Sequence, residues 1–292
     1  MKAVYETNLK NLELLVRGKV RDMYKVDDEH LMIVTTDRLS AFDVIMPDPI
    51  PAKGKVLTQV SNFWFNRSKK IIQNHLVDFN LKDYVANDDE YQQLEGRTII
   101  VKKMKALPVE AIVRGYLIGS GWKDYQQTGE VCGIALPEGL EQAQKLPEIL
   151  YTPSTKADVG DHDMNVDYQH TVGLLGEALA AQIKSVSIEL YKMASEYALE
   201  RGIIIADTKF EFGLDREDNL VLIDEILTPD SSRFWPLNQY QQGVSPPSFD
   251  KQYVRDYLET LDWDKKAPGP KLPDEVIKNT QLKYKEAMDL LL

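Results

Sequence analysis

Apolar and polar residues alternate from Ile203 to Gly213 (IIIADTKFEFG), which predicts a β-strand whose two faces differ in chemistry. Successive strand residues point to opposite sides of a sheet, so every second residue lies on the same face. One face carries Asp207, Lys209 and Glu211, and the other carries Thr208, Phe210 and Phe212. The polar residues 215–219 interrupt the pattern and Leu220 to Leu227 resumes it, so we expect a hairpin with one ionic face.

Helices are predicted where apolar residues recur at intervals of three and four or where short amphipathic stretches lie between prolines: 56–74, 171–201, 249–261 and 274–292. Gly202 is expected to end the second of these helices, because glycine commonly follows the last helical turn. Further strands are predicted at 12–16, 31–35, 97–106 and 109–114, with Pro108 as a boundary between the last two. This mixture of elements indicates a mixed α/β (α+β) fold.

The composition is that of a soluble globular protein of 292 residues, and no apolar run is long enough to cross a bilayer. The first ten residues contain no apolar core, so secretion is not indicated. A net charge of −11 argues against a nucleic-acid surface, which needs a basic stripe. The single cysteine, Cys132, cannot form an internal disulfide, which fits a reducing cytoplasm, and its neighbours offer no base that would activate it.

The ionic face of the predicted hairpin suggests a magnesium site. A hairpin register can bring Asp224 or Glu225 beside Glu211, and opposed like charges need a neutralising partner. Mg²⁺ binds oxygen ligands, usually one or two carboxylates with waters and phosphates, and Lys209 is suited to contact a phosphate oxygen. The alternative is an amphipathic hairpin whose charged face is only solvated. The loop that follows, 228–233, ends in Arg233, whose guanidinium can bind a carboxylate or phosphate.

Four further polar segments are candidate ligand loops: Gly18–Arg21, 35–43, 115–122 and 152–163. The first offers a glycine and two cations to a phosphate, and the third adds three glycines to the donors of Arg114 and Ser120. Each also has a plainer interpretation: a surface hairpin, a turn closed by a serine hydroxyl, a strand-to-helix turn, and a solvated loop in which His162 is not a metal ligand. The chain contains neither a P-loop nor a dinucleotide fingerprint.

Taken together, seven motifs in this order resemble the phosphoribosylaminoimidazole-succinocarboxamide synthase (SAICAR synthetase) family: GKVRDMY, TTDRLSAFDV, PVEAIVRGYLIGSGW, STKADVGDHD, ADTKFEFG, LIDEILTPDSSRFWP and SPPSFDKQYVRDYLE. The resemblance covers nearly the whole chain. It implies a two-lobed fold related to ATP-grasp, with an antiparallel β-rich ATP-binding lobe at residues 1–106. A larger α/β lobe at 107–292 is expected to hold the magnesium and substrate sites, with ATP in the cleft between the lobes.

The resemblance also implies the reaction of a cytoplasmic carbon–nitrogen ligase of purine biosynthesis. The carboxylate of carboxyaminoimidazole ribonucleotide is joined to the amine of L-aspartate while ATP becomes ADP and phosphate, with Mg²⁺ as cofactor. No nucleic-acid or membrane partner is expected, and the oligomeric state is left open. Phosphorylation of the carboxylate would supply the leaving group that direct amine attack lacks, and electrostatic positioning would supply most of the catalysis.

Site residues follow from the same resemblance. Those expected at ATP are Gly18, Lys19, Val20, Arg21, Met104 and Ala106. The catalytic residues are expected to be Lys209, Glu211 and Asp224, of which Glu211 and Asp224 would bind Mg²⁺. Substrate-binding residues are expected to be Asp37, Ser40, Asp43, Arg114, Ser120, Lys156, Asp161 and Arg233, with Lys156 and Asp161 at aspartate.

Two other functions fit some of the same residues. A small-molecule kinase of similar two-lobed fold could use the same acidic and basic residues, and it would release a phosphorylated product without aspartate. A non-catalytic nucleotide-binding module would bind ATP without turnover.

Overall fold

The computed structural model describes residues 3–156 and 164–292, which form two compact units. Unit 1 comprises Met1–Phe63, His75–Lys103 and Phe249–Leu292, and unit 2 comprises Trp64–Asn74 and Met104–Ser248. The sequence interpretation placed a single boundary after residue 106. The units instead separate after Lys103, and the C-terminal segment belongs to unit 1 because its apolar side chains complete a core there.

Unit 1 contains an antiparallel sheet in the order β1-β2-β3-β7-β6 and a short β4–β5 hairpin. Its elements are β1 (Glu13–Arg17), β2 (Arg21–Lys25), β3 (His30–Thr35), β4 (Ser40–Ala41), β5 (Val44–Ile45), β6 (Leu76–Val77), η1 (Leu81–Asp83), α2 (Asp88–Leu94), β7 (Thr98–Lys102), α6 (Gln252–Glu259) and α7 (Asp274–Leu291). The hairpin packs against α6 and α7 through a cluster that includes Leu39, Met46, Val254, Leu258 and Val276. Helix α1 (Lys53–Ser68) begins in unit 1 and ends in unit 2, six residues before the predicted end of this helix.

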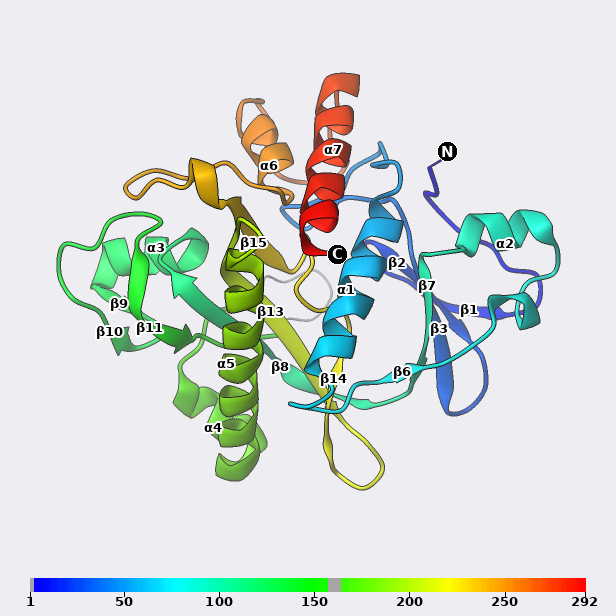
Figure 1. Ribbon diagram of the computed structural model, residues 1–292, viewed down its shortest axis with the longest axis horizontal. Coiled ribbons are helices and arrows are strands. Elements are labelled where there is room, and N and C mark those ends of the chain that lie inside the picture. Colours follow the sequence, from blue (N-terminus) through cyan, green and yellow to red (C-terminus); the bar gives the residue numbers. More distant parts are fainter. Residues whose placement is uncertain (1–2, 157–163) are drawn as a thin grey trace. The chain divides into compact units, whose positions relative to one another are not determined.

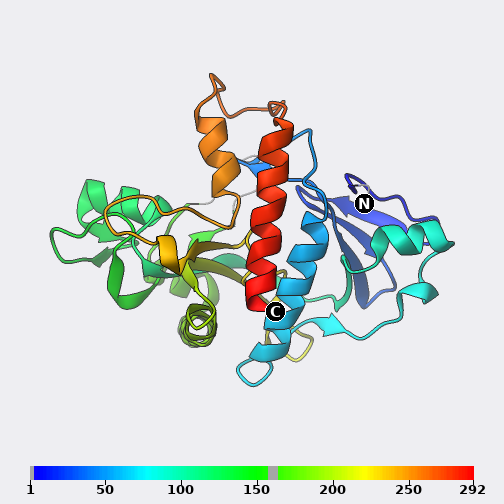
Figure 2. The ribbon, with the colours of Figure 1, turned by 45° about the horizontal axis from the view of Figure 1, so that its top comes forward.

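Unit 2 is built on a second antiparallel sheet in which β13 lies between β8 and β14, and β11 and β12 pair with the other edge of β8. Its elements are β8 (Lys105–Tyr116), α3 (Gly119–Thr128), β9 (Glu130–Val131), β10 (Ile134–Ala135), β11 (Lys145–Tyr151), β12 (Ser154–Thr155), α4 (Tyr168–Leu175), α5 (Glu177–Leu199), β13 (Ile203–Leu214), β14 (Leu220–Ile223), β15 (Ser232–Pro236) and η2 (Leu237–Gln239). Figures 1 and 2 show α5 on one face of this sheet. The predicted mixed α/β fold is confirmed.

Strand β13 has the two unlike faces that the alternation predicts. Phe210 and Phe212 are buried, whereas Lys209 and Glu211 on the other face are only partly buried. The hairpin to β14 is also confirmed, but β14 ends at Ile223 instead of continuing to Leu227. Asp224 adopts a left-handed backbone conformation (φ 67°), which is incompatible with an extended strand.

Strand β8 continues through Pro108, so the predicted boundary at this residue is wrong. The boundary between the two strands lies earlier, at residues 103 and 104, which connect β7 to β8. Pro108 is tolerated because the register between β8 and β13 shifts in this region, between the pairs Glu211–Glu110 and Gly213–Ala106. A proline removes one ladder hydrogen bond, and an irregularity in the pairing is where a sheet accepts that loss.

The predicted helix at 171–201 is two helices, α4 and α5, that meet at Gly176. This residue has φ 81° and ψ 156°, which is outside the helical region and is readily adopted only by glycine. Periodicity alone missed the break because the apolar spacing continues across it. Among the described residues, no helix combines the length and apolarity that a membrane crossing requires.

Candidate active site

The pairing of β8 with β13 collects charged side chains on one face of the sheet in unit 2. Asp207 lies opposite Arg114, Lys209 opposite Ile112, and Glu211 opposite Glu110. The two ends of this row are four residues apart on each strand, roughly 13 Å at about 3.3 Å per residue. We refer to the end at Asp207 as the guanidinium end and to the end at Glu211 as the carboxylate end.

At the guanidinium end, two arginines share one carboxylate. Arg114 Nη1 donates to Asp207 Oδ2 at 2.9 Å, and Arg233 Nη1 donates to the same oxygen. Arg114 is almost completely buried, and its other nitrogens donate to Thr152 and Ser120 at 2.9 Å each. Burial lowers the pKa of Arg114, Asp207 partly reverses this, and Arg233 adds to the lowering. Two cations with one anion leave a net positive site.

The N-terminus of α3 lies at the same end. The first turn of α3 reads Gly-Ser-Gly, and the N-cap residue Ile118 provides no side-chain hydrogen bond to it. Amides at such a helix start attract an anion. Gly119 has φ 62°, and a Cβ there would lie 2.4 Å from Arg233 Nη2, so only glycine allows the guanidinium to approach. The structure thus brings together Arg114, Ser120 and Arg233, three of the residues that the family resemblance assigned to substrate binding.

At the carboxylate end, two opposed glutamates contact one ammonium group. Lys209 Nζ donates to Glu110 Oε1 at 2.5 Å and to Glu211 Oε1 at 3.2 Å. Burial alone would lower the pKa of Lys209, but the carboxylates of Glu211, Glu110 and Asp224 outweigh it and raise the pKa above its ordinary value. Lys209 therefore stays cationic at neutral pH and acts as a fixed positive charge.

Glu110 was not among the predicted site residues. Ser154 Oγ donates to its second oxygen at 3.1 Å, so the carboxylate is oriented by two donors. The strand Val109–Arg114 did contain a signal: Glu110 and Arg114 are four residues apart and so share a face. The partner strand could not be identified from the sequence, and the opposition to Glu211 depends on that partner.

Lys156 also belongs to the carboxylate end, because its ammonium donates to Glu211 Oε2. Asp161, which the resemblance assigned to the same aspartate-binding loop, lies outside the described residues. Asp224 follows β14 directly and is near enough to raise the pKa of Lys209. Within residues 3–156 and 164–292, no group of three or more histidine, cysteine, aspartate or glutamate residues has the arrangement of a metal site.

In unit 1, hydrogen bonds from neighbouring side chains to its backbone carbonyl groups fix the turn Gly18–Arg21. The buried guanidinium of Arg38 donates to the carbonyls of Gly18 at 2.9 Å and Lys19 at 3.2 Å, and Thr36 donates to that of Val20. Lys19 is half exposed and pairs with Asp43 at 2.5 Å. The backbone of the predicted phosphate turn is therefore fixed, while its lysine reaches the surface.

The segment 35–43 divides into a buried part and an exposed hairpin. Asp37 is completely buried, and its carboxylate accepts hydrogen bonds from both Arg97 terminal nitrogens and from the amides of Val4 and Gly54. This arrangement favours a structural role for Asp37. Ser40 lies in β4, and Asp43 lies in the tight turn to β5, where the φ of 62° at Asp43 is unusual for a residue other than glycine.

The predicted adenine segment belongs to unit 2. Met104 precedes β8, and Ala106 pairs with Gly213 of β13. A Cβ on Gly213 would lie 2.8 Å from the Cβ of Met104, so the two backbones pass closely.

The chain matches the SAICAR synthetase family model over residues 14–270. It is 63% identical over 283 residues to the phosphoribosylaminoimidazole-succinocarboxamide synthase of Thioalkalivibrio sulfidiphilus, covering 97% of this chain and 96% of that protein. Identity to the enzyme of the same name from Methylococcus capsulatus is 59% over 284 residues, with the same coverage of both chains.

Solved structures give the same result. The SAICAR synthase of Saccharomyces cerevisiae, solved in complex with SAICAR, superimposes with a TM-score of 0.91 at 43% identity and covers 99% of this chain and 98% of its own. A SAICAR synthetase solved in complex with ADP has a TM-score of 0.70 at 24% identity, covers 94% of this chain and 96% of its own, and supports the fold alone.

Proposed function

The chain belongs to the SAICAR synthetase family, and we propose that the ionic face of β8 and β13 binds the ribonucleotide and the transferred phosphoryl group in the reaction of that family. The protein is an ATP-dependent ligase of purine biosynthesis. It joins the carboxylate of carboxyaminoimidazole ribonucleotide to the amine of L-aspartate and forms SAICAR, ADP and phosphate.

The observation that carries the assignment of residues is the separation of the two charged ends on one sheet face. The ribonucleotide bears a phosphate at one end and a carboxylate at the other, and the sheet offers net positive charge at the guanidinium end. Arg114, Arg233 and the start of α3 bind the phosphate as a preorganised set of donors. Asp207 holds both guanidinium groups in place. The ribonucleotide carboxylate then points toward the carboxylate end.

Lys209 assists the chemical step as a fixed cation. The ribonucleotide carboxylate attacks the γ-phosphorus of ATP, the bond to the ADP oxygen breaks, and an acyl phosphate forms. The neutral amine of aspartate then attacks the acyl carbon, loses a proton, and expels phosphate. Negative charge grows on phosphoryl oxygens in both steps, and a cation already held by Glu110 and Glu211 stabilises it without reorganisation.

Glu211 and Asp224 would hold Mg²⁺ at the carboxylate end. The donor set fits this ion, since Mg²⁺ takes one or two carboxylates with waters and substrate phosphates and needs no larger protein cluster. The ion pairs of Lys209 and Lys156 with the glutamates at this end also support the proposal, because they indicate that these carboxylates attract cations. When bound, the ion would neutralise triphosphate charge. Glu211 and Asp224 would fix its position.

The remaining assignments stay predictions. The residues concerned at ATP are Gly18, Lys19, Val20, Arg21, Met104 and Ala106, and those concerned at the substrates are Ser40, Asp43, Lys156 and Asp161. The pairing of Lys156 with Glu211 supports a role near the reacting groups, where aspartate must also arrive.

The test is a complete assay followed by assays that each omit one component. Purified protein is incubated with ATP, Mg²⁺, aspartate and the ribonucleotide, and phosphate and SAICAR are measured. We expect both products only in the complete mixture. Stable phosphorylation of the ribonucleotide without aspartate would identify a kinase, and ATP binding without turnover would identify a binding module.

A further inference from the structure

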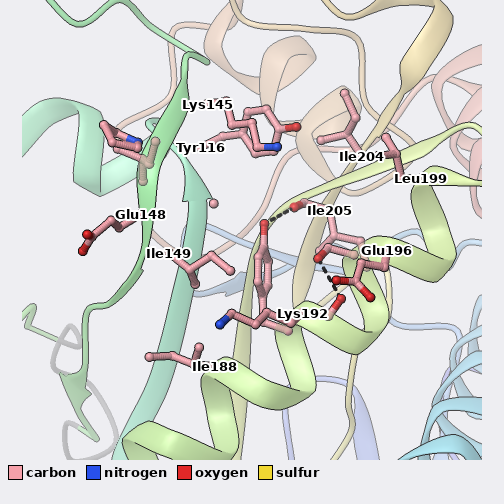
Figure 3. A pocket seen from close by; sticks show the side chains of 15 residues that line it. Tyr116, Lys145, Glu148, Ile149, Ile188, Lys192, Glu196, Leu199, Ile204 and Ile205 are labelled. Carbon is pink, nitrogen blue, oxygen red and sulfur yellow. Dashed lines mark hydrogen bonds between the residues drawn. The ribbon is translucent and has the colours of Figure 1, made fainter.

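Tyr191 on α5 connects that helix to β13, on the opposite side of the sheet from the ionic face. The side chain is buried, and its hydroxyl donates to the backbone carbonyl of Ile205 at 2.6 Å. Figure 3 shows this hydrogen bond as the dashed line that ends at Ile205. The carbonyl is two residues from Asp207, which holds both arginines of the guanidinium end.

The edge of β13 that pairs with β15 is irregular here, whereas the pairing with β8 is regular from Asp207 to Glu211. The pairing between β13 and β15 shifts register between Ile205 and Thr208, so regular pairing with β15 does not fix the stretch that contains Asp207. Shifts of this kind bend a strand and re-aim its side chains. The hydroxyl of Tyr191 therefore supplies a contact from outside the sheet at the start of the irregular stretch.

The same hydroxyl lies against the backbone of β8. A Cβ on Gly115 would lie 2.1 Å from Tyr191 Oη, and Gly115 follows Arg114 directly. Since neighbouring strand residues face opposite sides, Gly115 faces the tyrosine while Arg114 faces the site. One phenol group thus contacts both strands, next to the two residues that form the Arg114–Asp207 ion pair. Burial raises the pKa of Tyr191, so the hydroxyl keeps the proton that it donates.

The ring of Tyr191 is packed in the interior of unit 2, with only 2% of the residue exposed. The tyrosine borders a cavity of about 740 Å³ between α5, β11 and the adjoining ends of β8 and β13, and side chains such as Ile149, Ile188 and Ile204 line it (Figure 3). Of the two parts of this side chain, only the hydroxyl donates a hydrogen bond to the Ile205 carbonyl. Because phenylalanine keeps the ring, the role of the hydroxyl can be tested without removing the packing of the ring.

We propose that Tyr191 is a positioning residue for ribonucleotide binding. Its hydroxyl fixes the backbone at Ile205, which sets the direction of the Asp207 carboxylate, and Asp207 in turn orients Arg114 and Arg233. The inference rests on the proposed function of the guanidinium end. No role in ATP binding or in the chemical step follows from this geometry.

The experiment compares steady-state kinetics of Tyr191→Phe, Asp207→Asn and a control, Tyr197→Phe. Tyr197 is on the same helix, and its ring contacts Trp64 and the Arg201 guanidinium, which phenylalanine can also contact. We expect Tyr191→Phe to raise the KM for the ribonucleotide about three- to tenfold, the factor that one lost hydrogen bond produces. The KM for ATP and kcat should stay within twofold, and Tyr197→Phe should match the unmodified protein.

Asp207→Asn distinguishes the proposed function of the guanidinium end from the proposed role of Tyr191. If it leaves the ribonucleotide KM unchanged, the proposed function of the guanidinium end is wrong. If it raises that KM while Tyr191→Phe does not, the role of Tyr191 is wrong and the site assignment stands. Equal increases in the KM for ATP and ribonucleotide in Tyr191→Phe would also overturn the inference, because they would indicate a general loss of structure.

A second substitution tests the same contact from β8. Gly115→Ala should displace the tyrosine hydroxyl and raise the ribonucleotide KM. In a Tyr191→Phe background its effect should be smaller, because the nearest remaining ring atom lies 2.9 Å from the new Cβ instead of 2.1 Å. Additive effects of the two substitutions would show that they do not act through this contact. Hydrogen exchange at residues 203–208 should be faster in both single variants.

Discussion

Glu110 and Glu211 lie directly opposite each other on β8 and β13, and the ammonium of Lys209 contacts both carboxylates. Like charges at opposed positions destabilise a sheet unless a cation lies between them. Lys209 therefore stabilises the opposed glutamates in the sheet, and we also propose that it stabilises charge during the reaction. Substitutions can separate these two effects.

Lys209→Met should lower kcat about 10²- to 10³-fold, the usual cost of losing one preorganised electrostatic contact in a transition state. Lys192→Met on α5 is the control, since Lys192 is exposed. Steady-state assays at saturating substrate give the comparison. Because the pKa of Lys209 is raised, loss of its proton should not limit kcat below roughly pH 10. Near-normal turnover of Lys209→Met would remove this residue from the mechanism.

Glu211→Gln should also abolish most turnover while the protein stays folded. The amide keeps the shape of the side chain but loses the charge that Lys209, Lys156 and the proposed Mg²⁺ require. Circular dichroism should match the unmodified protein, and isothermal titration should show weaker Mg²⁺-dependent binding of ATP. Unchanged ATP affinity at every Mg²⁺ concentration would contradict the assignment of Glu211 as a metal ligand.

Arg114→Ala should weaken ribonucleotide binding by about a hundredfold or more and affect ATP much less. It removes three hydrogen bonds at the guanidinium end and leaves Asp207 with one arginine. Breaking a buried ion pair also destabilises a protein by roughly 3–5 kcal/mol, so the melting temperature should fall. Binding measured below the new melting temperature separates the two effects. Equal losses for both ligands would count against the proposed site.

Asp37→Asn should act on stability first. Asp37 and Arg97 form a completely buried ion pair, so neutralising one partner should cost about 3–5 kcal/mol in the free energy of unfolding. Asp43→Asn is the control, because its ion pair with Lys19 is half exposed and contributes little. Urea denaturation followed by fluorescence gives both values. A stable Asp37→Asn protein with a raised ribonucleotide KM would restore the substrate-binding role that the family resemblance suggested.

Cys132 should react slowly with alkylating reagents. Burial raises its pKa to about 11, against roughly 8.5 for an exposed cysteine. The thiolate fraction at pH 7.5 is therefore smaller by a factor of roughly 300, and only the thiolate is nucleophilic. Iodoacetamide labelling of the folded protein should accelerate as the pH rises toward 11. Fast labelling at neutral pH would show that the thiol is activated after all.

Local sequence rules predicted those features that depend on neighbours in the chain. The alternation along β13 determined which residues share its ionic face, and the spacing of apolar residues located α7. Pro108 and Gly176 show the limit of such rules. Proline is acceptable in β8 only because the register shifts there, and the break at Gly176 depends on a backbone conformation that periodicity does not report.

The sequence predicted site residues that lie within one motif. It missed those that join the site only through the pairing of two strands that are distant in the sequence. Arg114 and Ser120 lie in one motif and contact each other. Glu110 joins the carboxylate end only through its pairing with β13, and nothing in its own segment identifies that strand. The burial of Asp37 depends on Arg97, sixty residues away, which no motif connects to it.

The assembly of unit 1 from both ends of the chain has a consequence for synthesis. Val254, Leu258 and Val276 belong to a core that also contains Leu39 and Met46, so ribosomes must add the last segment before this core can close. At about 5–20 residues per second, translation of residues 249–292 takes roughly 2–9 s. The hairpin of β4 and β5 is translated well before this segment, so it still lacks its apolar cover throughout that interval, whereas the segments of unit 2 have already been translated.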